Sequence, residues 1–517
     1  MSETIDITIS PEGAANHHEI EKALRQSGKK ADWDFSILKR SIDARRKPIL
    51  IRLRCEIFPK GEKPEIEPSP ILDTNVSTAP EVFIAGSGPC GLFAAIALIE
   101  QGLKPIIIER GKDVRARRRD LALLNREEIV NPESNYCFGE GGAGTYSDGK
   151  LYTRSKKRGS VNRILNYLVA FGAPSDILVD AHPHIGTNKL PKLIEAIREY
   201  IISSGGEVRF NTKLTDLKIS GNSIQKIQLN GNEWIDCKAL ILATGHSARD
   251  IFTLLHNRNV LIEAKPFALG VRVEHPQDII DRIQYKGDSS SEYLPPASYS
   301  LVHQVENKGV YSFCMCPGGI IAPCATSPGE IVTNGWSPSK RNNPYANSGM
   351  VVSIDEKSYD PQGTGDPMKA LEYQMKVEKA AWKLGGGLQI APAQRLVDFT
   401  NGKVSNDLPN CSYQPGLHSA NLGECLPKEV HFRLQEALKV FGKKMHGFYT
   451  NEAIVVATES RTSSPVRIPR NENLEHPQVS GLFPAGEGAG YAGGIVSAAI
   501  DGQKSAEAVA AKMKASA

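Results

Sequence analysis

The sequence predicts an α/β fold that combines a parallel sheet with an inserted β-rich domain and a small N-terminal α/β module. Three observations lead to this prediction. A strand, a glycine-rich turn, a helix and a second strand follow one another over residues 81–109, as in a βαβ unit. Residues 266–440 carry more strand signals, turn residues and long polar loops. The alternating strand and helix pattern returns only near residue 481.

At roughly 100–200 residues per domain, a chain of 517 residues predicts two to four domains. In the first segment, Ile5, Ile7 and Ile9 alternate with polar residues as in a half-buried strand, and residues 51–57 alternate in the same way. Residues 35–46 fit either a helix or a hairpin. We divide the chain into an N-terminal α/β module (1–58), a proline-rich linker (59–78), the first part of a nucleotide-binding domain (79–265), an inserted substrate or cap domain (266–440) and the second part of the nucleotide-binding domain (441–517).

The overall composition excludes several classes of protein. The net charge is only +4, so nucleic acid is not expected to bind through bulk charge. No apolar run approaches the ~20 residues of a membrane span, and the N-terminus lacks the basic start and apolar core of a signal peptide. Nine scattered cysteines predict reduced thiols in a cytoplasmic protein, and their spacing predicts no metal site.

The turn after the first strand of the βαβ unit carries a dinucleotide fingerprint. Gly86 permits the tight turn, Gly88 lets the backbone approach a pyrophosphate, and Gly91 lets the helix pack closely on the strand. Glu109 ends the next strand, where it would accept hydrogen bonds from ribose hydroxyls. The cofactor-binding residues predicted here are Gly86, Ser87, Gly88, Pro89, Cys90, Gly91, Glu109 and Arg110.

Later segments distinguish FAD from NAD. A buried strand ends in a turn at 243–245, and residues 481–490 resemble the second flavin motif of two-dinucleotide-fold flavoproteins, with Glu487 in place of the more usual Asp. A further helix begins after Gly494, and its N-terminus could stabilise negative charge on a reduced flavin. An NAD enzyme needs none of these elements, so the sequence predicts FAD, held also by Ala243, Thr244, Gly245, Gly486, Glu487, Gly493, Gly494 and Ile495.

Six motifs resemble those of the bacterial family of uncharacterized FAD-dependent dehydrogenases, and the resemblance covers nearly the whole chain. It implies a two-dinucleotide-binding-type FAD fold, similar to that of glutathione reductase, with an inserted domain, and it leaves the substrate open. It also implies that the glycine-rich loop at 139–149 wraps the pyrophosphate and that Leu214 lies beside the adenine. The motifs are residues 135–151, 244–250, 265–267, 311–319, 459–465 and 484–494. The residues of the loop predicted to contact the cofactor are Gly141, Gly142, Ala143, Gly144 and Ser147.

Four residues are weak candidates for catalysis, and each has a structural alternative. Arg461 could bind a substrate carboxylate or phosphate with Glu459 as orienter or base, or the two could form a structural ion pair. His246 could donate a proton near the cofactor, or it could have a structural role as a capping residue or as a core histidine whose hydrogen bonds are satisfied. Cys316 and Cys314 are two apart on a predicted strand and so should share one face, where they could be redox-active or simply buried.

The function predicted from the sequence is an FAD-dependent oxidoreductase that transfers a hydride between flavin N5 and a small organic substrate. A second NAD(P)H module is missing, so the electron donor could be transiently bound NAD(P)H, the substrate or a partner protein. Two alternatives stay open, a flavoprotein that binds or modifies RNA and one whose FAD is structural. Basic residues at 39–54, 115–119 and 154–158 bear on RNA binding, but a solvated face or contacts to FAD phosphates is the favoured explanation of the last two runs, and RNA binding is the minor hypothesis.

Overall fold

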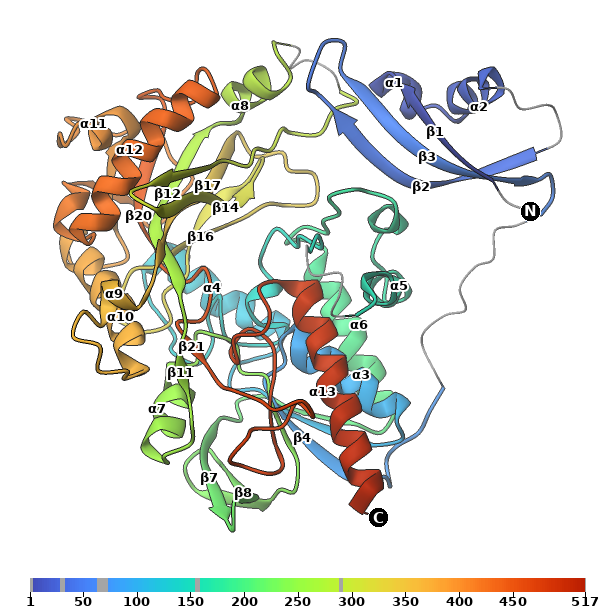
Figure 1. Ribbon diagram of the computed structural model, residues 1–517, viewed down its shortest axis with the longest axis vertical. Coiled ribbons are helices and arrows are strands. Elements are labelled where there is room, and N and C mark those ends of the chain that lie inside the picture. The colour runs from blue at the N-terminus through green and yellow to red at the C-terminus, as the bar shows by residue number, and fades with distance from the viewer. Residues whose placement is uncertain (1–2, 28–32, 63–72, 154–158, 288–291, 517) are drawn as a thin grey trace.

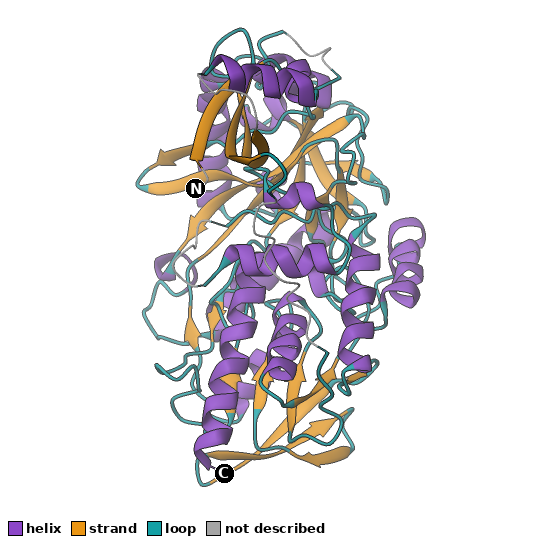
Figure 2. Ribbon diagram, turned by 90° about the vertical axis from the view of Figure 1, so that its right-hand side faces the viewer, coloured by secondary structure: helices purple, strands orange, loops and turns teal. Residues whose placement is uncertain are grey.

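The computed structural model describes residues 3–27, 33–62, 73–153, 159–287 and 292–516. In Figure 1, the small N-terminal module and a large β-rich region occupy the upper end of the long axis, and a parallel sheet with the C-terminal helix occupies the lower end. Figure 2 shows the same order from the side. Within the described residues, no helix has both the length and the hydropathy required to cross a membrane. The basic residues 154–158 lie outside the described part of the chain.

A five-stranded sheet forms the centre of the lower region, and each of its neighbouring strand pairs is parallel. Side chains alternate between its two faces. Val82 and Ile84 enter one hydrophobic core, whereas Phe83 and Ala85 enter another, so the sheet is buried on both sides, as parallel sheets usually are. The strands, in spatial order, are β22 (Leu482–Pro484), β10 (Leu240–Leu242), β4 (Glu81–Ala85), β5 (Lys104–Ile108) and β6 (Glu207–Arg209).

Two helices pack against each other on one face of this sheet. Helix α3 (Pro89–Glu100) is apolar nearly all round and is buried from Cys90 to Ile99, which is typical of a central helix. Helix α13 (Ile495–Ser516) packs along it. A Cβ atom on Gly502 would lie 2.0 Å from the carbonyl oxygen of Cys90, so this close approach of the two helices requires glycine.

The remaining elements of the lower region surround the sheet. One of them is the helix α6 (Leu190–Ser203). An antiparallel meander joins β6 to β10. The other elements are α4 (Val114–Glu127), α5 (Val161–Ala170), α7 (Arg249–Asn257), the meander strands β7 (Leu214–Ser220), β8 (Ser223–Leu229) and β9 (Glu233–Asp236), and the paired strands β11 (Glu263–Ala264) and β21 (Val466–Arg467).

A seven-stranded sheet, called the cap sheet below, organises the β-rich region. Helices pack against it on the side that faces outward in Figure 1. Its strands, in spatial order, are β13 (Val302–Val305), β14 (Lys308–Cys316), β17 (Tyr345–Ile354), β12 (Phe267–Pro276), β20 (Ile454–Glu459), β18 (Ala391–Arg395) and β19 (Leu417–Ser419). The associated elements are α8 (Gln277–Gln284), α9 (Glu356–Tyr359), α10 (Met368–Leu384), α11 (Leu396–Thr400), α12 (Lys428–Lys444), β15 (Ile320–Pro323) and β16 (Thr333–Trp336).

One strand of the cap sheet lies in the part of the chain that the sequence assigned to the nucleotide-binding domain. β20 falls within residues 441–517, yet it pairs with β12 and β18 of the cap sheet. The cap sheet thus extends past residue 440, where the sequence placed the end of the insert. A short apolar run such as 454–457 predicts a buried strand but carries no information about which sheet the strand joins.

The N-terminal module is a three-stranded antiparallel sheet with two helices. Residues 35–46, which fitted either a helix or a hairpin, are mostly strand. Arg40 joins the module to the lower region through an ion pair of 2.7 Å with Asp180. The predicted linker lies partly outside the described residues, but its end packs on α6 through Val76, which is buried. The elements are β1 (Glu3–Ile9), α1 (Pro11–Ala14), α2 (His17–Gln26), β2 (Trp33–Asp43) and β3 (Leu50–Pro59).

Candidate functional site

A cavity of about 390 Å³ opens at the carboxyl edge of the parallel sheet. The residues that follow three neighbouring strands line it: Gly86 after β4, Glu109 after β5 and Ala243 after β10. This edge is where open α/β sheets bind their ligands. On the opposite side, Phe313 and Cys314 of β14 and Asn334 of β16 line the same cavity. The site therefore lies between the nucleotide-binding region and the cap.

The glycine turn after β4 has the geometry that a dinucleotide requires. Gly86 has a φ of +105°, and a Cβ atom there would lie 2.4 Å from the carbonyl oxygen of Ala243. A Cβ atom on Gly91 would lie 1.9 Å from the carbonyl oxygen of Gly86. Gly88, by contrast, has only Gly142 nearby and caps α3 without a side-chain bond. The first N–H groups of α3 are thus available to an anion in the cavity.

Glu109 has a role that the sequence did not predict. One of its carboxylate oxygens accepts hydrogen bonds from the N–H (2.9 Å) and hydroxyl (2.8 Å) of Ser87, and the other accepts from the N–H groups of Gly111 (2.9 Å) and Gly139 (3.0 Å). These four bonds fill the lone-pair positions of a carboxylate. Glu109 therefore fastens three loops around the cavity, and a ribose hydroxyl would have to share one of these bonds.

The glycine-rich loop at 139–149 is held by a buried arginine. Arg117 is fully buried and donates hydrogen bonds of 2.8–2.9 Å to four backbone carbonyls, those of Asn135, Tyr136, Glu140 and Gly142. The expectation that the basic run at 115–119 forms a solvated face or contacts phosphates is therefore wrong for Arg117. The periodicity of α4 turns this one residue inward, and its guanidinium fixes the shape of the loop.

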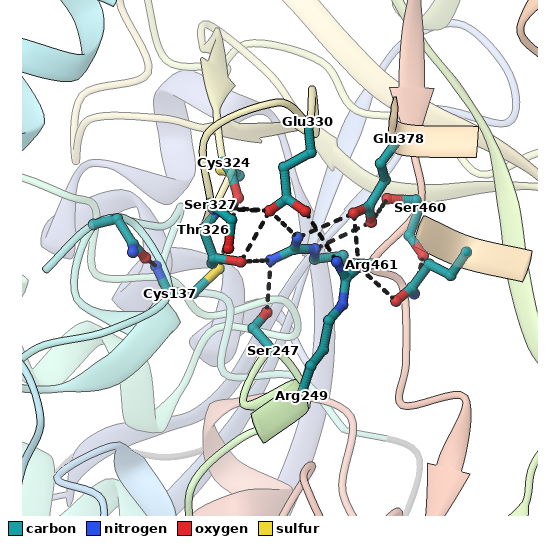
Figure 3. Close-up of polar contacts among 12 residues, drawn as sticks. Cys137, Ser247, Arg249, Cys324, Thr326, Ser327, Glu330, Glu378, Ser460 and Arg461 are labelled. Atoms are coloured by element: carbon teal, nitrogen blue, oxygen red, sulfur yellow. Dashed lines mark hydrogen bonds and ion pairs between the residues drawn. The ribbon is translucent and has the colours of Figure 1, made fainter. Parts of the chain in front are cut away.

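Arg461 belongs to a buried cluster of charges in which all of its own donors are used (Figure 3). Its guanidinium donates to Glu378 (3.1 and 3.2 Å), Glu330 (2.7 Å), Thr326 (2.7 Å) and Ser247 (3.3 Å). These five bonds occupy all five N–H groups of an arginine side chain. Arg461 lines the cavity but has no donor left for a substrate carboxylate, so the structural alternative holds for this residue.

A second guanidinium completes this cluster. Arg249 on α7 donates to Glu330 (3.0 Å) and Glu378 (2.7 Å), so two arginines face two carboxylates. The two guanidiniums outweigh the effect of burial and lower the pKa of Glu330 to about 2. We call Arg249, Glu330, Glu378 and Arg461 the clamp, because they join the helix after β10 to α10 and to the loop before β16.

Glu459 lies in a different cluster from Arg461, although the two residues are neighbours in the sequence. Its carboxylate accepts a 2.8 Å hydrogen bond from Arg272, and both side chains are fully buried. Burial raises the pKa of Glu459 to about 7 despite the adjacent guanidinium. Glu459 does not line the cavity, so it has no direct access to a substrate.

His246 and Glu487 both line the cavity and form a pair. The Nδ1 atom of the imidazole lies 3.2 Å from a carboxylate oxygen of Glu487. His246 was predicted either to donate a proton or to have a structural role, and its position on the cavity wall favours proton donation. Glu487 was predicted as one of the residues that hold FAD. Its carboxylate also orients the imidazole, since a carboxylate accepts from the protonated Nδ1.

The two cysteines of β14 do not share a face as their spacing predicted. The pairing of β14 with β17 shifts register between Phe313 and Cys316, and Cys314 has a φ of +49°. This bulge breaks the alternation of the strand. Cys314 is exposed and lines the cavity, whereas Cys316 is buried behind it. The prediction that Cys316 is the catalytic candidate is therefore wrong for direct contact with a ligand, because Cys314 is the one of the two that lines the cavity.

Most predicted cofactor-binding residues line the cavity, and the rest lie just behind its wall. Ser87, Gly91, Gly141 and Gly486 belong to the second group, together with the catalytic candidates Glu459 and Cys316. The predicted residues that line the cavity are Gly86, Gly88, Pro89, Cys90, Glu109, Arg110, Gly142, Ala143, Gly144, Ser147, Leu214, Ala243, Thr244, Gly245, His246, Arg461, Glu487, Gly493, Gly494 and Ile495.

Sequence reasoning missed several polar residues of the cavity wall. Asp148 lies near the end of the glycine-rich loop and Lys150 follows it directly, so the Asp-Gly-Lys segment was the available signal. Thr462 lies in the motif at 459–465, but only its neighbours Glu459 and Arg461 were singled out, and Asn334 lies on the short strand β16, which carries no recognisable motif. Lys213 precedes Leu214 and forms ion pairs with Glu133 and Asp250.

The residues present fit a flavin dinucleotide. Backbone at Gly88 and at 142–144 faces the cavity, and Cβ atoms on Gly493 and Gly494 would meet nothing within 4 Å. These two glycines precede α13, a helix of 22 residues, so its positive N-terminal end faces the same space. The cavity thus offers helix N-termini at two places, one suited to phosphates and the other to an anionic ring.

Comparisons with known proteins agree with this site. Residues 266–462 match the family described as "FAD-dependent protein, C-terminal domain-like", and residues 1–58 match a "Domain of unknown function (DUF8436)". A relative from Clostridium beijerinckii, described as an uncharacterized protein, is 41% identical over 497 residues, which cover 92% of this chain and 92% of the relative.

Solved structures with similar folds are much more distant. The flavin-dependent brominase Bmp2 has a TM-score of 0.36 and 13% identity, covering 84% of this chain and 80% of its own. A geranylgeranyl bacteriochlorophyll reductase-like protein from Thermoplasma acidophilum has a TM-score of 0.33 and 13% identity, covering 85% and 80%. Likenesses this weak say nothing about the reaction. The match to the C-terminal domain and the close relative are decisive: the chain belongs to this family of FAD-dependent proteins, and its cofactor is FAD.

Proposed function

We propose that the protein is an oxidoreductase of the two-dinucleotide-binding type, which transfers a hydride between flavin N5 and a small organic substrate held against the cap. One observation carries this proposal. A single cavity is walled on one side by the dinucleotide-binding loops and on the other by Phe313, Cys314 and Asn334 of the cap. The glycine turn would hold the dinucleotide part of the cofactor, and the cap residues would border the space left for its reactive part and the substrate.

The residues of the lower region would hold the cofactor. The N–H groups at the start of α3 and the loop at 142–144 suit the pyrophosphate, and Leu214 borders the end of the cavity proposed for the adenine. The cofactor, when bound, supplies two-electron chemistry. The N-terminus of α13 would stabilise the negative charge that this chemistry creates, because unpaired N–H groups and the helix dipole favour an anion there.

Proton transfer falls to the pair of His246 and Glu487. A hydride transfer to or from an organic substrate usually requires a proton to move as well, and an imidazole serves this purpose near neutral pH. His246 borders the cavity, and a carboxylate oxygen of Glu487 lies 3.2 Å from its Nδ1 atom and orients the ring. Arg461 of the clamp lines the cavity but has no free donor, so we assign the clamp to closing the space behind the reacting groups rather than to binding substrate.

The RNA alternative receives no support from the N-terminal module. Three of its arginines are paired with carboxylates of the protein: Arg45 and Arg52 with Asp43, and Arg54 with Asp6. A phosphate backbone would have to compete with each of these ion pairs. The experiment described next distinguishes the possible electron donors, which are NAD(P)H, the substrate itself and a partner protein.

Anaerobic addition of NADH, NADPH or candidate substrates to the purified holoprotein tests the proposal through the main visible flavin band. Bleaching by one nucleotide would identify a reductase, and bleaching by an organic substrate a dehydrogenase. A flavin that no donor reduces, and that shows no turnover after reduction with dithionite, would indicate a structural FAD.

Gly88→Glu is the matched flavin-free control. A Cβ atom at Gly88 meets only Gly142, at 3.9 Å, and the residue has a φ of −70°, so the fold tolerates a side chain there. The added carboxylate would lie where we place the phosphates and should weaken FAD binding ~100-fold by like-charge repulsion. Unchanged flavin content in this variant would contradict the placement.

A further inference from the structure

Two cysteines of β14 lie one behind the other at the wall of the flavin cavity. Cys314 is the exposed one among the nine free cysteines, and Cys316 is fully buried. The Cys316 thiol donates a hydrogen bond of 3.2 Å to the carbonyl oxygen of Cys314. The positive φ of Cys314 is unusual for a residue with a side chain, and such backbone conformations cluster at functional sites.

Two cations converge on these thiols from different elements. The Nζ atom of Lys150 and the Nη2 atom of Arg272 each lie 3.7 Å from the sulfur of Cys316, and Arg272 also donates to the carbonyl of Cys314 at 2.8 Å. Asp148 lies 3.5 Å from Lys150, and Glu459 pairs with Arg272. Each cation therefore has a carboxylate partner and also lies next to the sulfur of Cys316, so two positive groups stand beside the thiols.

The two thiols differ in their acidity as a result. Hydrogen bonding from the Cys316 thiol, and then the charges of Lys150 and Arg272, hold the pKa of Cys314 well below its ordinary value. The same interaction with Cys314, together with burial, raises the pKa of Cys316 well above its ordinary value. One thiolate beside one thiol is the arrangement of a reactive dithiol.

We propose that Cys314 and Cys316 form a redox-active dithiol that exchanges two electrons with the flavin. This inference rests on the proposed function, because it requires the redox end of FAD to lie at the cap side of the cavity. In the oxidising direction, an S–S bond forms between the Cys314 thiolate and the Cys316 sulfur. The electron pair released and the proton of Cys316 pass to the oxidised flavin, which becomes the anionic reduced flavin. The reverse reaction opens the disulfide.

The consequence is a second two-electron centre in the protein. Cys314 would be the thiol that a substrate in the cavity contacts. The buried Cys316 would be the resolving thiol, which forms the disulfide with Cys314. Lys150 and Arg272 would hold the thiolate in both directions of the exchange, since a nearby cation stabilises the sulfur anion. The bulge at 314–315 serves this purpose because a regular strand would not turn Cys314 into the cavity with Cys316 behind it.

Counting electrons in the holoprotein tests this proposal. The protein is oxidised with hexacyanoferrate, desalted, and titrated anaerobically with dithionite while the flavin band is followed. The wild type is expected to take up four electrons per flavin, and Cys314→Ser two. Cys425→Ser, which removes a buried thiol of the cap core, is the matched control and should take up four.

A thiol count provides the second readout. After the oxidation step and denaturation, the wild type should show two fewer free thiols than the fully reduced protein, and Cys314→Ser should show no such loss. Uptake of only two electrons by the flavin-loaded wild type, or of four by Cys314→Ser, would overturn the dithiol proposal alone. A protein whose flavin no donor can use would instead overturn the proposed function, so the two failures are distinguishable.

Discussion

Two buried clusters of charged side chains lie next to the same cavity, and they differ in whether their groups remain accessible from it. The clamp of Arg249, Glu330, Glu378 and Arg461 is closed, because two guanidiniums meet two carboxylates and Arg461 has no free donor. The cluster around Arg272, which holds Glu459, Lys150, Asp148 and the two thiols, is open, because Lys150, Asp148 and the exposed Cys314 all line the cavity. Charged side chains that neutralise one another within a closed cluster stabilise the fold. A reaction with a ligand requires a side chain that the ligand can still reach.

Removal of one carboxylate should break the clamp and have the largest effect. Glu378 is fully buried and accepts hydrogen bonds from Arg249, Arg461 and Ser460. Glu378→Ala leaves two buried guanidiniums facing one carboxylate, which should cost about 3–5 kcal/mol of stability. The measurement is the shift of the urea unfolding midpoint of the holoprotein.

Glu436→Ala is the control for that prediction. Glu436 pairs with Lys439 on the exposed side of α12, where an ion pair contributes less than about 1 kcal/mol. A midpoint shift in Glu378→Ala no larger than that of Glu436→Ala would show that the clamp does not hold the cap in place.

The clamp should also make the protein sensitive to acid. The pKa of Glu330 is about 2 in the folded protein, against 4.5 ordinarily, so its ionised form is favoured by folding. A lowered pKa adds stability that is complete above pH 4.5 and is lost as the pH falls toward 2. The linkage amounts to about 3 kcal/mol. Unfolding midpoints between pH 5 and 3 should fall steeply in the wild type and less steeply in Glu330→Gln.

Glu459 in the open cluster should behave in the opposite sense. Burial raises its pKa to about 7, so the folded protein binds a proton that the unfolded chain has released. Its contribution therefore favours folding at low pH and is lost as the pH rises from 4.5 through 7. Glu459→Gln should flatten this part of the stability profile. A profile that is unchanged between pH 5 and 8 would contradict the assignment.

The smallest expected effect concerns the acidity of Cys314. Lys150→Met removes one of the two cations beside the thiols and should raise the pKa of Cys314 by about one unit. The pH dependence of alkylation of the reduced protein by iodoacetamide measures this pKa. Lys150→Arg keeps the charge and should leave the profile near that of the wild type. Equal profiles in all three proteins would show that Lys150 does not act on the thiolate.

The flavin side of the site could be predicted from the sequence to a large extent. Gly86, Gly88 and Gly91 are close in the chain, and the dihedral angles and close approaches that make them necessary are local. The residues after β10 and before α13 were recognised for the same reason. Each of these segments presents backbone atoms at the end of a strand or the start of a helix, so a short stretch of sequence determines its geometry.

Only the tertiary structure decided the cap side and the roles of the charged residues. Arg461 and Glu459 are two apart in the sequence, yet they belong to different clusters because β20 joins the cap sheet and its end separates them. Arg117 appeared to be one of several basic residues on a helix, and burial gave it four carbonyl partners. Cys314 faces the cavity because a bulge breaks the strand period. The physical reason is common to all three: partners that are distant in sequence fix the environment of a side chain, whereas local spacing fixes only the backbone that carries it.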